Sequence, residues 1–175
     1  MKKLIFLFLL SCIMISCGSL DQFIELSVDN ELTESIDAHV PQTLGAVASF
    51  NLTETADLNS GDLAKYLDKI SALKINTLSY KFIEFSGNSA GTITSGTLKF
   101  DNTVVATLTN FNISNASTAR TVFNITDSAF LTQIEATLLN NKSTTILLKG
   151  SALSDAGSMD FKIEVSMNMT VTINE

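Results

Sequence analysis

The C-terminal part of the chain carries its most regular pattern of apolar and polar residues. Apolar residues occupy every second position from Met159 to Ile173, and each residue between them is polar. This period of two over fifteen residues predicts a β-strand about 50 Å long with one buried face. Such a strand has to bend through a large sheet or pass between two packed sheets. We expect a core strand, with an edge open to another molecule as the alternative.

Shorter alternating segments predict further strands. Residues 24–28 alternate between apolar and polar side chains, and apolar residues alternate on both sides of Asp101–Asn102, which indicates a hairpin. Ile146 and Leu148 predict a strand that runs to Gly150, and residues 155–158 have the composition of a turn. Ser, Thr and Asn supply 54 of the 175 residues, which favours strands with one polar face.

Two segments have the spacing of amphipathic helices. Asn59 or Ser60 can cap the first, whose apolar stripe comprises Leu63, Tyr66, Leu67, Ile70 and Leu73. Asp127 starts the second, which ends at Asn140–Asn141 and has an apolar stripe of Leu131, Ile134 and Leu138. The predicted fold class is therefore mainly β, either β-sandwich-like or built of large curved antiparallel sheets, with these two helices packed on the sheets.

Composition excludes several classes of protein. The chain is 45% hydrophobic and 17% charged, which is untypical of a disordered protein, and two Cys are too few for a disulfide scaffold. A net charge of −7 argues against a nucleic-acid partner. The length of 175 residues is that of a single domain.

The N-terminal residues resemble the signal peptide of a bacterial lipoprotein. Lys2 and Lys3 precede a short apolar run, and the segment ends in Met14-Ile15-Ser16-Cys17. An apolar pair, a small residue and then Cys is similar to the lipobox, and the whole is similar to small lipoproteins of Bacteroidota-type bacteria. The resemblance implies cleavage before Cys17 and acylation of its thiol, for example by palmitate. Residues 1–16 are then a signal peptide, and residues 17–175 form one domain anchored to a lipid bilayer.

Two alternatives remain at this terminus. Leu9-Leu10-Ser11-Cys12 fits the family's preference for Leu better, but it leaves an apolar run of only seven residues. An ordinary secretory signal with incidental cysteines is the other. Gly18 follows Cys17 in place of the acidic residue that directs lipoproteins to the inner membrane, so the resemblance implies export to the outer membrane, facing the periplasm or the cell surface.

Negative charge is concentrated near the proposed anchor. Removal of the signal peptide leaves nine basic and eighteen acidic residues, a net charge of −9, and nine of the acids precede the first base, Lys65. We interpret residues 18–64 as contributing a solvated acidic face. A face for a cationic partner and a calcium site are the alternatives, although no EF-hand loop occurs.

The sequence contains no recognisable catalytic motif. His39 is the only histidine and is interpreted as a surface or strand-end residue, and no Ser lies in a nucleophile elbow. No metal ligands, cofactor-binding residues or catalytic residues are assigned, and we do not expect an enzyme. Met167 and Met169 share a face with Phe161, which suits core filling or, alternatively, an adaptable apolar pocket.

These observations predict an exported, membrane-anchored lipoprotein that acts as a non-enzymatic binding or structural module in the cell envelope. The alternative function is a carrier of a lipid or another apolar ligand in the periplasm. An enzyme is the third and least favoured hypothesis. The partners expected are the lipid bilayer, through acylated Cys17, and a cationic or apolar molecule.

Overall fold

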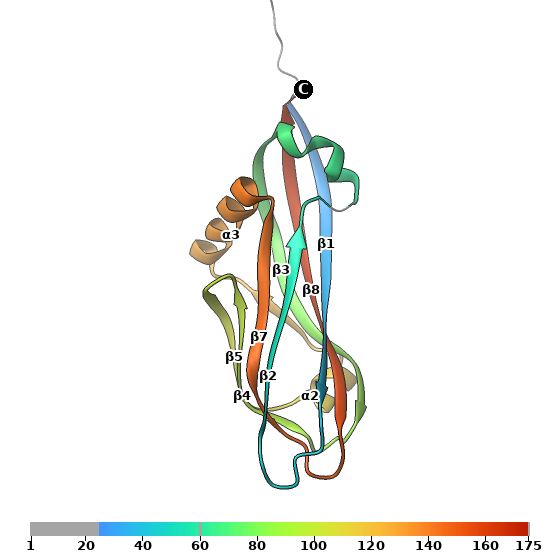
Figure 1. Ribbon diagram of the computed structural model, residues 1–175. Helices are drawn as coiled ribbons and strands as arrows, with labels where there is room; N and C mark the ends of the chain where they lie inside the picture. Colours follow the sequence, from blue (N-terminus) through green and yellow to red (C-terminus); the bar gives the residue numbers. More distant parts are fainter. Residues whose placement is uncertain (1–24, 60, 175) are drawn as a thin grey trace, which may run out of the picture.

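The computed structural model describes residues 25–59 and 61–174 as an elongated β-sandwich (Figure 1). Its elements, in chain order, are β1 (Glu25–Val40), β2 (Ala48–Asp57), the 3-10 helix η2 (Gly61–Lys69), β3 (Ile70–Gly87), β4 (Thr92–Phe100), β5 (Thr103–Asn112), α2 (Ile113–Thr118), β6 (Val122–Ile125), α3 (Ser128–Asn141), β7 (Ser143–Leu153) and β8 (Met159–Asn174). The predicted mainly β class with few helices is confirmed.

The eight strands form two antiparallel sheets. Sheet A has the order β1-β8-β3-β6, and sheet B has the order β2-β7-β4-β5. The first strand pairs with the last, the second with the seventh, the third with the sixth and the fourth with the fifth. The chain is thus one long antiparallel hairpin of four strand pairs rolled into two layers, which is the topology of a jelly roll.

The predicted C-terminal strand is confirmed as β8, and it lies between β1 and β3. It pairs with β1 along its whole length, from Met159 opposite Val40 to Asn174 opposite Glu25. Every apolar residue of the alternating pattern is at most 3% exposed. Both edges of β8 are occupied, so the alternative of an edge open to another molecule is wrong.

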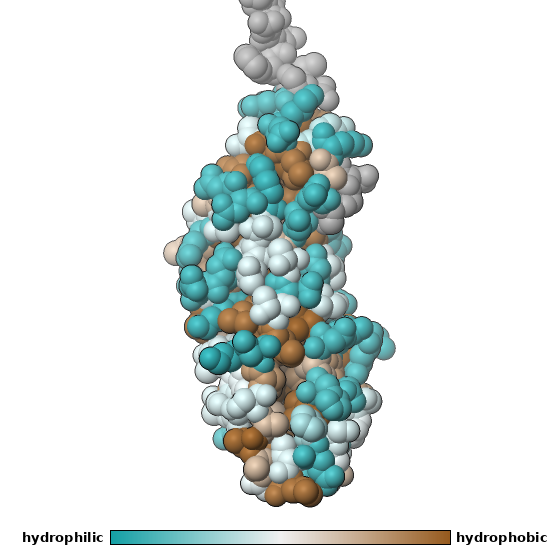
Figure 2. Space-filling view, in the orientation of Figure 1, coloured by the Kyte–Doolittle hydropathy of each residue, from teal (hydrophilic) through white to brown (hydrophobic). Residues whose placement is uncertain are grey.

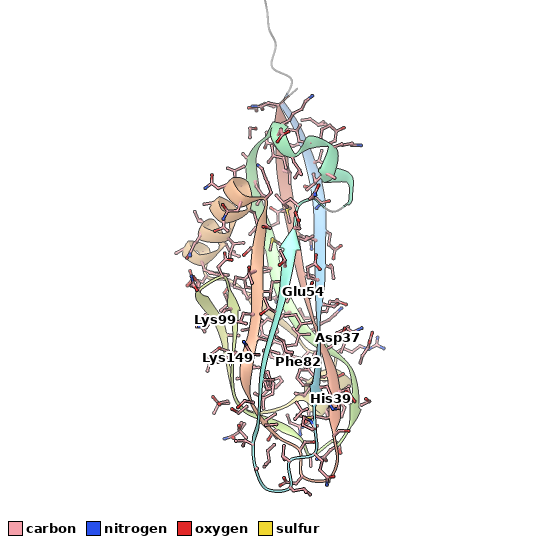
Figure 3. The ribbon with its side chains drawn as sticks, viewed as in Figure 1. Asp37, His39, Glu54, Phe82, Lys99 and Lys149 are labelled. Atoms are coloured by element: carbon pink, nitrogen blue, oxygen red, sulfur yellow. The ribbon has the colours of Figure 1, made fainter. Side chains whose placement is uncertain are left out.

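Aromatic rings fill the core between the two sheets around Phe82. Phe82 of β3 contacts Phe111 with a ring-centroid distance of 4.8 Å and Phe161 with one of 6.0 Å. Tyr80 stacks on Phe123 at 5.0 Å. Figure 3 shows Phe82 between the two sheets. These contacts tie strands of both sheets together, because Phe111 belongs to β5 and the other rings to sheet A.

Helix α3 agrees with the prediction at both ends. The carboxylate of Asp127 accepts hydrogen bonds from the backbone N–H groups of Ala129 and Phe130, at 3.0 and 3.1 Å. The helix ends at Asn141, and Ile134 and Leu138 are buried. It packs beside the part of β3 that β6 leaves unpaired, where the Glu135 carboxylate accepts the N–H of Ile75 at 2.8 Å.

The first predicted helix is shorter than expected. The 3-10 helix η2 ends at Lys69, so Ile70 and Leu73 belong to β3. Both side chains are buried although they stand three residues apart, because the register of β3 against β8 shifts between Ile70 and Ala72. A shift of one residue in a strand reproduces the spacing of a helical stripe, which is why the pattern misled the prediction.

Strand β2 and two short elements have no counterpart in the prediction. Helix α2 has six residues and β6 has four, too few for a periodic pattern to emerge. The predicted hairpin at Asp101–Asn102 is confirmed as β4 and β5. The strand predicted from residue 24 begins, as far as the structure describes it, at Glu25 and continues to Val40, while Ile24 lies outside the described residues.

The two ends of the sandwich differ. Glu25 and Asn174 pair at one end, and the β1–β2 and β7–β8 turns lie at the opposite end (Figure 1). There the carboxylate of Asp155 accepts hydrogen bonds from Thr43 Oγ1 at 2.9 Å and from the Gly45 N–H at 2.6 Å. These bonds fix a loop that leaves Leu44 81% exposed, and apolar residues are visible at this end in Figure 2.

No helix among the described residues is both long and apolar enough to cross a membrane.

Candidate functional site

Charged side chains meet on the outward face of sheet A, near the end that carries the β1–β2 turn. Lys162 of β8 lies between strands β1 and β3, opposite Asp37 on one side and Ile83 on the other. Its Nζ is 2.8 Å from the carboxylate of Glu84 and 3.5 Å from that of Asp37. The hydrogen bond to Glu84 raises the pKa of Lys162, so this ammonium stays protonated at the centre of the cluster.

A hydrogen-bonded pair and a further ion pair flank this centre. His39 Nδ1 lies 2.6 Å from Asp160 Oδ1, and the side chains are 62% and 54% exposed. Lys81 of β3 pairs with Glu164 of β8 at 2.5 Å. Exposed pairs of this kind contribute less than about 1 kcal/mol each to stability. His39 is thus a surface residue next to the end of its strand, as expected (Figure 3).

Glu84 reaches Lys162 because β3 is irregular at this point. The register of β3 against β8 shifts between Ile83 and Ser86, and Glu84 has a φ of +52°. A non-glycine residue in the left-handed region costs roughly 1–2 kcal/mol. Bulges with this kind of strain re-aim a side chain and are frequent beside functional sites.

The bulge forms one wall of a surface hollow of about 600 Å³. We call it the Arg120 hollow. Strand β6 ends its pairing at Val122 opposite Lys81, so β3 continues past β6 and the turn after α2 closes the other side. The residues that line the hollow are Lys81, Ile83, Glu84, Phe85, Ser117, Arg120 and Val122.

Arg120 is the only arginine in the chain, against ten lysines. It has a φ of +50°, and its N–H donates to the Ser117 carbonyl at 3.1 Å. The next N–H, of Thr121, donates to the Ala116 carbonyl at 3.0 Å. Thus the backbone that carries Arg120 is fixed by the end of α2. Its side chain is exposed, and no described carboxylate lies within ion-pair distance of its guanidinium.

A second hollow of about 260 Å³ adjoins the first, and Glu84 lines both. Its other lining residues are Asp37, Ala38, His39, Asp160, Phe161 and Lys162. No Ser, Thr or Cys is among them, so the His39–Asp160 pair has no hydroxyl or thiol nucleophile to activate within this hollow. The arrangement suits binding of a polar or charged group more than covalent chemistry.

A separate group of carboxylates lies where the edge strands β1 and β2 approach each other. Glu34 shares the inward side of β1 with Leu32 and Ile36 and is partly buried. Burial raises the pKa of Glu34, and the nearby charges of Glu54 and Asp57 on β2 raise it further. Inward-pointing charges on edge strands oppose pairing with another sheet, which gives these residues a structural role.

The sequence-predicted residues have different outcomes. Cys17 and Cys12 lie outside the described residues. Met167 and Met169 are each 1% exposed and belong to the hydrophobic core, in agreement with core filling. Among the described residues, no group of three or more His, Cys, Asp or Glu is arranged to hold a metal ion.

The Arg120 hollow was missed from the sequence. Its walls come from β3, from α2 with the turn after it, and from β6, and both α2 and β6 are too short to predict. The one signal in the sequence is compositional: Arg120 is the single Arg in a chain whose remaining basic residues, apart from one His, are all Lys.

No protein-family model matches the chain, and no curated protein matches it. Solved structures with a similar backbone include the following three. A decameric BFDV capsid protein is 9% identical with a TM-score of 0.43, over 83% of this chain and 99% of that chain. Desmodium yellow mottle tymovirus is 8% identical with a TM-score of 0.44, over 90% and 92% of the two chains. Mud crab tombus-like virus is 9% identical with a TM-score of 0.39, over 91% and 86%.

Proposed function

We propose that this protein is a lipid-anchored, non-enzymatic binding module of the bacterial cell envelope, held through Cys17 at the outer membrane. The lipobox-like segment that ends at Cys17 supports the anchor. The two hollows on sheet A support binding, because each joins charged groups to apolar surface without a catalytic arrangement.

The observation that carries the proposal is the separation between the anchored end and the hollows. Seven residues stand between Cys17 and Glu25, so β1 would begin within about 30 Å of the anchor. Asp37 and His39 lie near the other end of β1, about 40 Å further along the strand. An anchor at Cys17 would therefore leave the hollows at the end of the domain that is far from the bilayer. A partner can reach them there.

The negative charge is consistent with this orientation. Glu25, Asp29 and Glu31 lie on the exposed part of β1 nearest the proposed anchor. Exposed carboxylates are repelled by anionic lipid headgroups, so they would discourage the domain from lying flat on such a membrane. The acidic face then keeps the module upright as well as soluble.

The carrier of an apolar ligand is the second candidate. The observation in its favour is the long apolar face of β8. That face is packed into the core, and the hollows described above are lined by surface residues. These facts favour binding at the surface over carriage in the interior. Native mass spectrometry of protein purified from its host would detect a co-purifying lipid if the carrier is right.

Cell fractionation tests the anchor. The Cys17→Ser variant should move from the membrane to the soluble fraction, whereas the matched Cys12→Ser variant should stay in the membrane. Retention of Cys17→Ser together with release of Cys12→Ser would assign the anchor to Cys12. If both variants and the wild-type protein are soluble, the anchored module is wrong.

A further inference from the structure

The Arg120 hollow has the properties of a site for a small organic anion. Its cation is a guanidinium, a planar group with paired donors that match the two oxygens of a carboxylate. The neighbouring lysines are already engaged, since Lys81 pairs with Glu164 and Lys162 with Glu84. Arg120 is therefore the cation at this surface that is left to bind an incoming anion.

The charged residues that line the two hollows favour an anion with a single negative charge. Lys81, Arg120 and Glu84 give the lining of the hollow a net charge of +1. The adjoining hollow adds the carboxylates of Asp37 and Asp160, with Lys162 as its cation. A second negative charge on the ligand would face these carboxylates, so a carboxylate fits the hollow better than a phosphate dianion.

The rest of the lining suits an apolar body. Ile83 and Phe85 are partly buried side chains of β3, and Val122 of β6 is 53% exposed. A ligand that covers Val122 removes apolar surface from water, which is favourable in proportion to the area covered. The volume of about 600 Å³ lies in the usual range for small-molecule sites.

The site is also fixed before any ligand arrives. Glu84 and Arg120 both stand in the left-handed region, with φ values of +52° and +50°. The bulge of β3 holds the first, and the hydrogen bonds at the end of α2 hold the second. Two strained residues that line one hollow indicate a fixed geometry, because such strain persists only where the surroundings impose it.

We propose that the Arg120 hollow binds a monocarboxylate carried on an apolar body. The carboxylate pairs with the guanidinium of Arg120, and the apolar body covers Phe85 and Val122. This assignment rests on the proposed binding function and specifies its ligand class.

Isothermal titration calorimetry on the full chain, reconstituted in phosphatidylcholine nanodiscs with empty nanodiscs as the blank, tests the assignment. The probes are 3-phenylpropionate, the neutral 3-phenylpropan-1-ol, the cationic 3-phenylpropylamine and the dianionic 2-phenylethyl phosphate. We expect 3-phenylpropionate to bind most tightly of the four. Arg120→Gln should weaken its binding roughly tenfold or more, and Arg120→Lys should weaken it less.

Two further variants complete the design. Val122→Asp should also weaken the binding of 3-phenylpropionate, since it adds a negative charge beside the carboxylate. Lys149→Gln removes an exposed cation from sheet B, on the other side of the sandwich from Asp37 in Figure 3, and should leave binding unchanged. Circular dichroism of each variant confirms that it is folded.

Three results would overturn the assignment. They are equal affinity for the alcohol and the propionate, unchanged affinity in Arg120→Gln, and no saturable binding of the propionate at concentrations up to about 10 mM. Any of them, with Cys17→Ser still released from the membrane, removes the ligand class but leaves the anchored module. Retention of Cys17→Ser in the membrane removes the anchor at Cys17 whatever the calorimetry shows.

Discussion

Gly96 of β4 lies directly opposite Gly150 of β7, and both are on the inward side of sheet B. The same row across the sheet continues to Phe50 on one side and to Leu108 on the other. A Cβ atom on Gly150 would lie 2.4 Å from the Ser95 carbonyl oxygen and 2.8 Å from Phe50 Cζ. The missing side chain of Gly150 thus provides the space into which the ring of Phe50 packs.

We expect Gly150→Ala to lower the free energy of unfolding by about 2–3 kcal/mol, because backbone atoms obstruct the new methyl group. Gly96→Ala is the matched control, since its Cβ would meet only the Cγ2 methyl of Ile93 at 3.0 Å, with no backbone atom of a non-neighbouring residue closer than 3.5 Å. It should cost about 1 kcal/mol or less. Urea unfolding of both variants measures the difference, and equal midpoints would show that the close approach at Gly150 is not restrictive.

Leu44→Asn should stabilise the protein by about 0.5–1 kcal/mol. Leu44 has a φ of +49°, and Asn adopts this left-handed conformation more readily than Leu. The side chain is 81% exposed, so little apolar contact is lost. Val47→Asn, in the same loop at a residue without positive φ, is the control and should bring no gain. A lower thermal midpoint for Leu44→Asn than for the wild type would contradict the prediction.

Glu135→Ala should lower the free energy of unfolding by about 1–3 kcal/mol, because it leaves the N–H of Ile75, on the part of β3 that does not pair with β6, without its acceptor. Glu135→Gln keeps an acceptor oxygen and should cost less. Native-state hydrogen exchange should show faster exchange of the Ile75 amide in the Ala variant than in the Gln variant. The prediction fails if the two variants exchange at the same rate.

The raised pKa of Glu34 determines how the stability of the fold changes with pH. A carboxyl whose pKa is higher in the folded state than in the unfolded state binds protons more tightly when folded. Its charged form therefore destabilises the fold above that pKa, and the penalty disappears as pH falls toward the ordinary value of 4.5.

Glu34→Gln should accordingly raise stability at pH 7 by a few tenths of a kcal/mol, since the group is only partly buried and solvent screens its charge. The gain should shrink as pH approaches 4.5. Glu31→Gln, on the exposed side of the same strand, is the control. Urea unfolding from pH 4.5 to 7.5 measures the effect, and a gain that does not vary with pH would contradict the assigned cause.

Long periodic segments of this fold were predictable from the sequence. The alternation of β8 is regular because one of its faces is buried along the whole strand. Helix α3 was predictable because a cap at Asp127 and a buried stripe including Ile134 and Leu138 coincide. In both cases the local pattern and the tertiary packing impose the same period.

The remaining parts depend on contacts between distant segments. The boundary between η2 and β3 is set by a register shift against β8, which changes the period at Ile70. The Arg120 hollow depends on where β6 stops pairing with β3, at Val122 opposite Lys81. No local pattern encodes either feature, because both arise from how strands align across the sheet.

The mass of the intact protein purified from the membrane fraction tests the central claim most directly. The proposal of a lipid-anchored module predicts a mature chain that begins at Cys17, with a mass that exceeds the polypeptide by that of lipid acyl groups. A chain that retains residues 1–16, or one without added lipid, would contradict it.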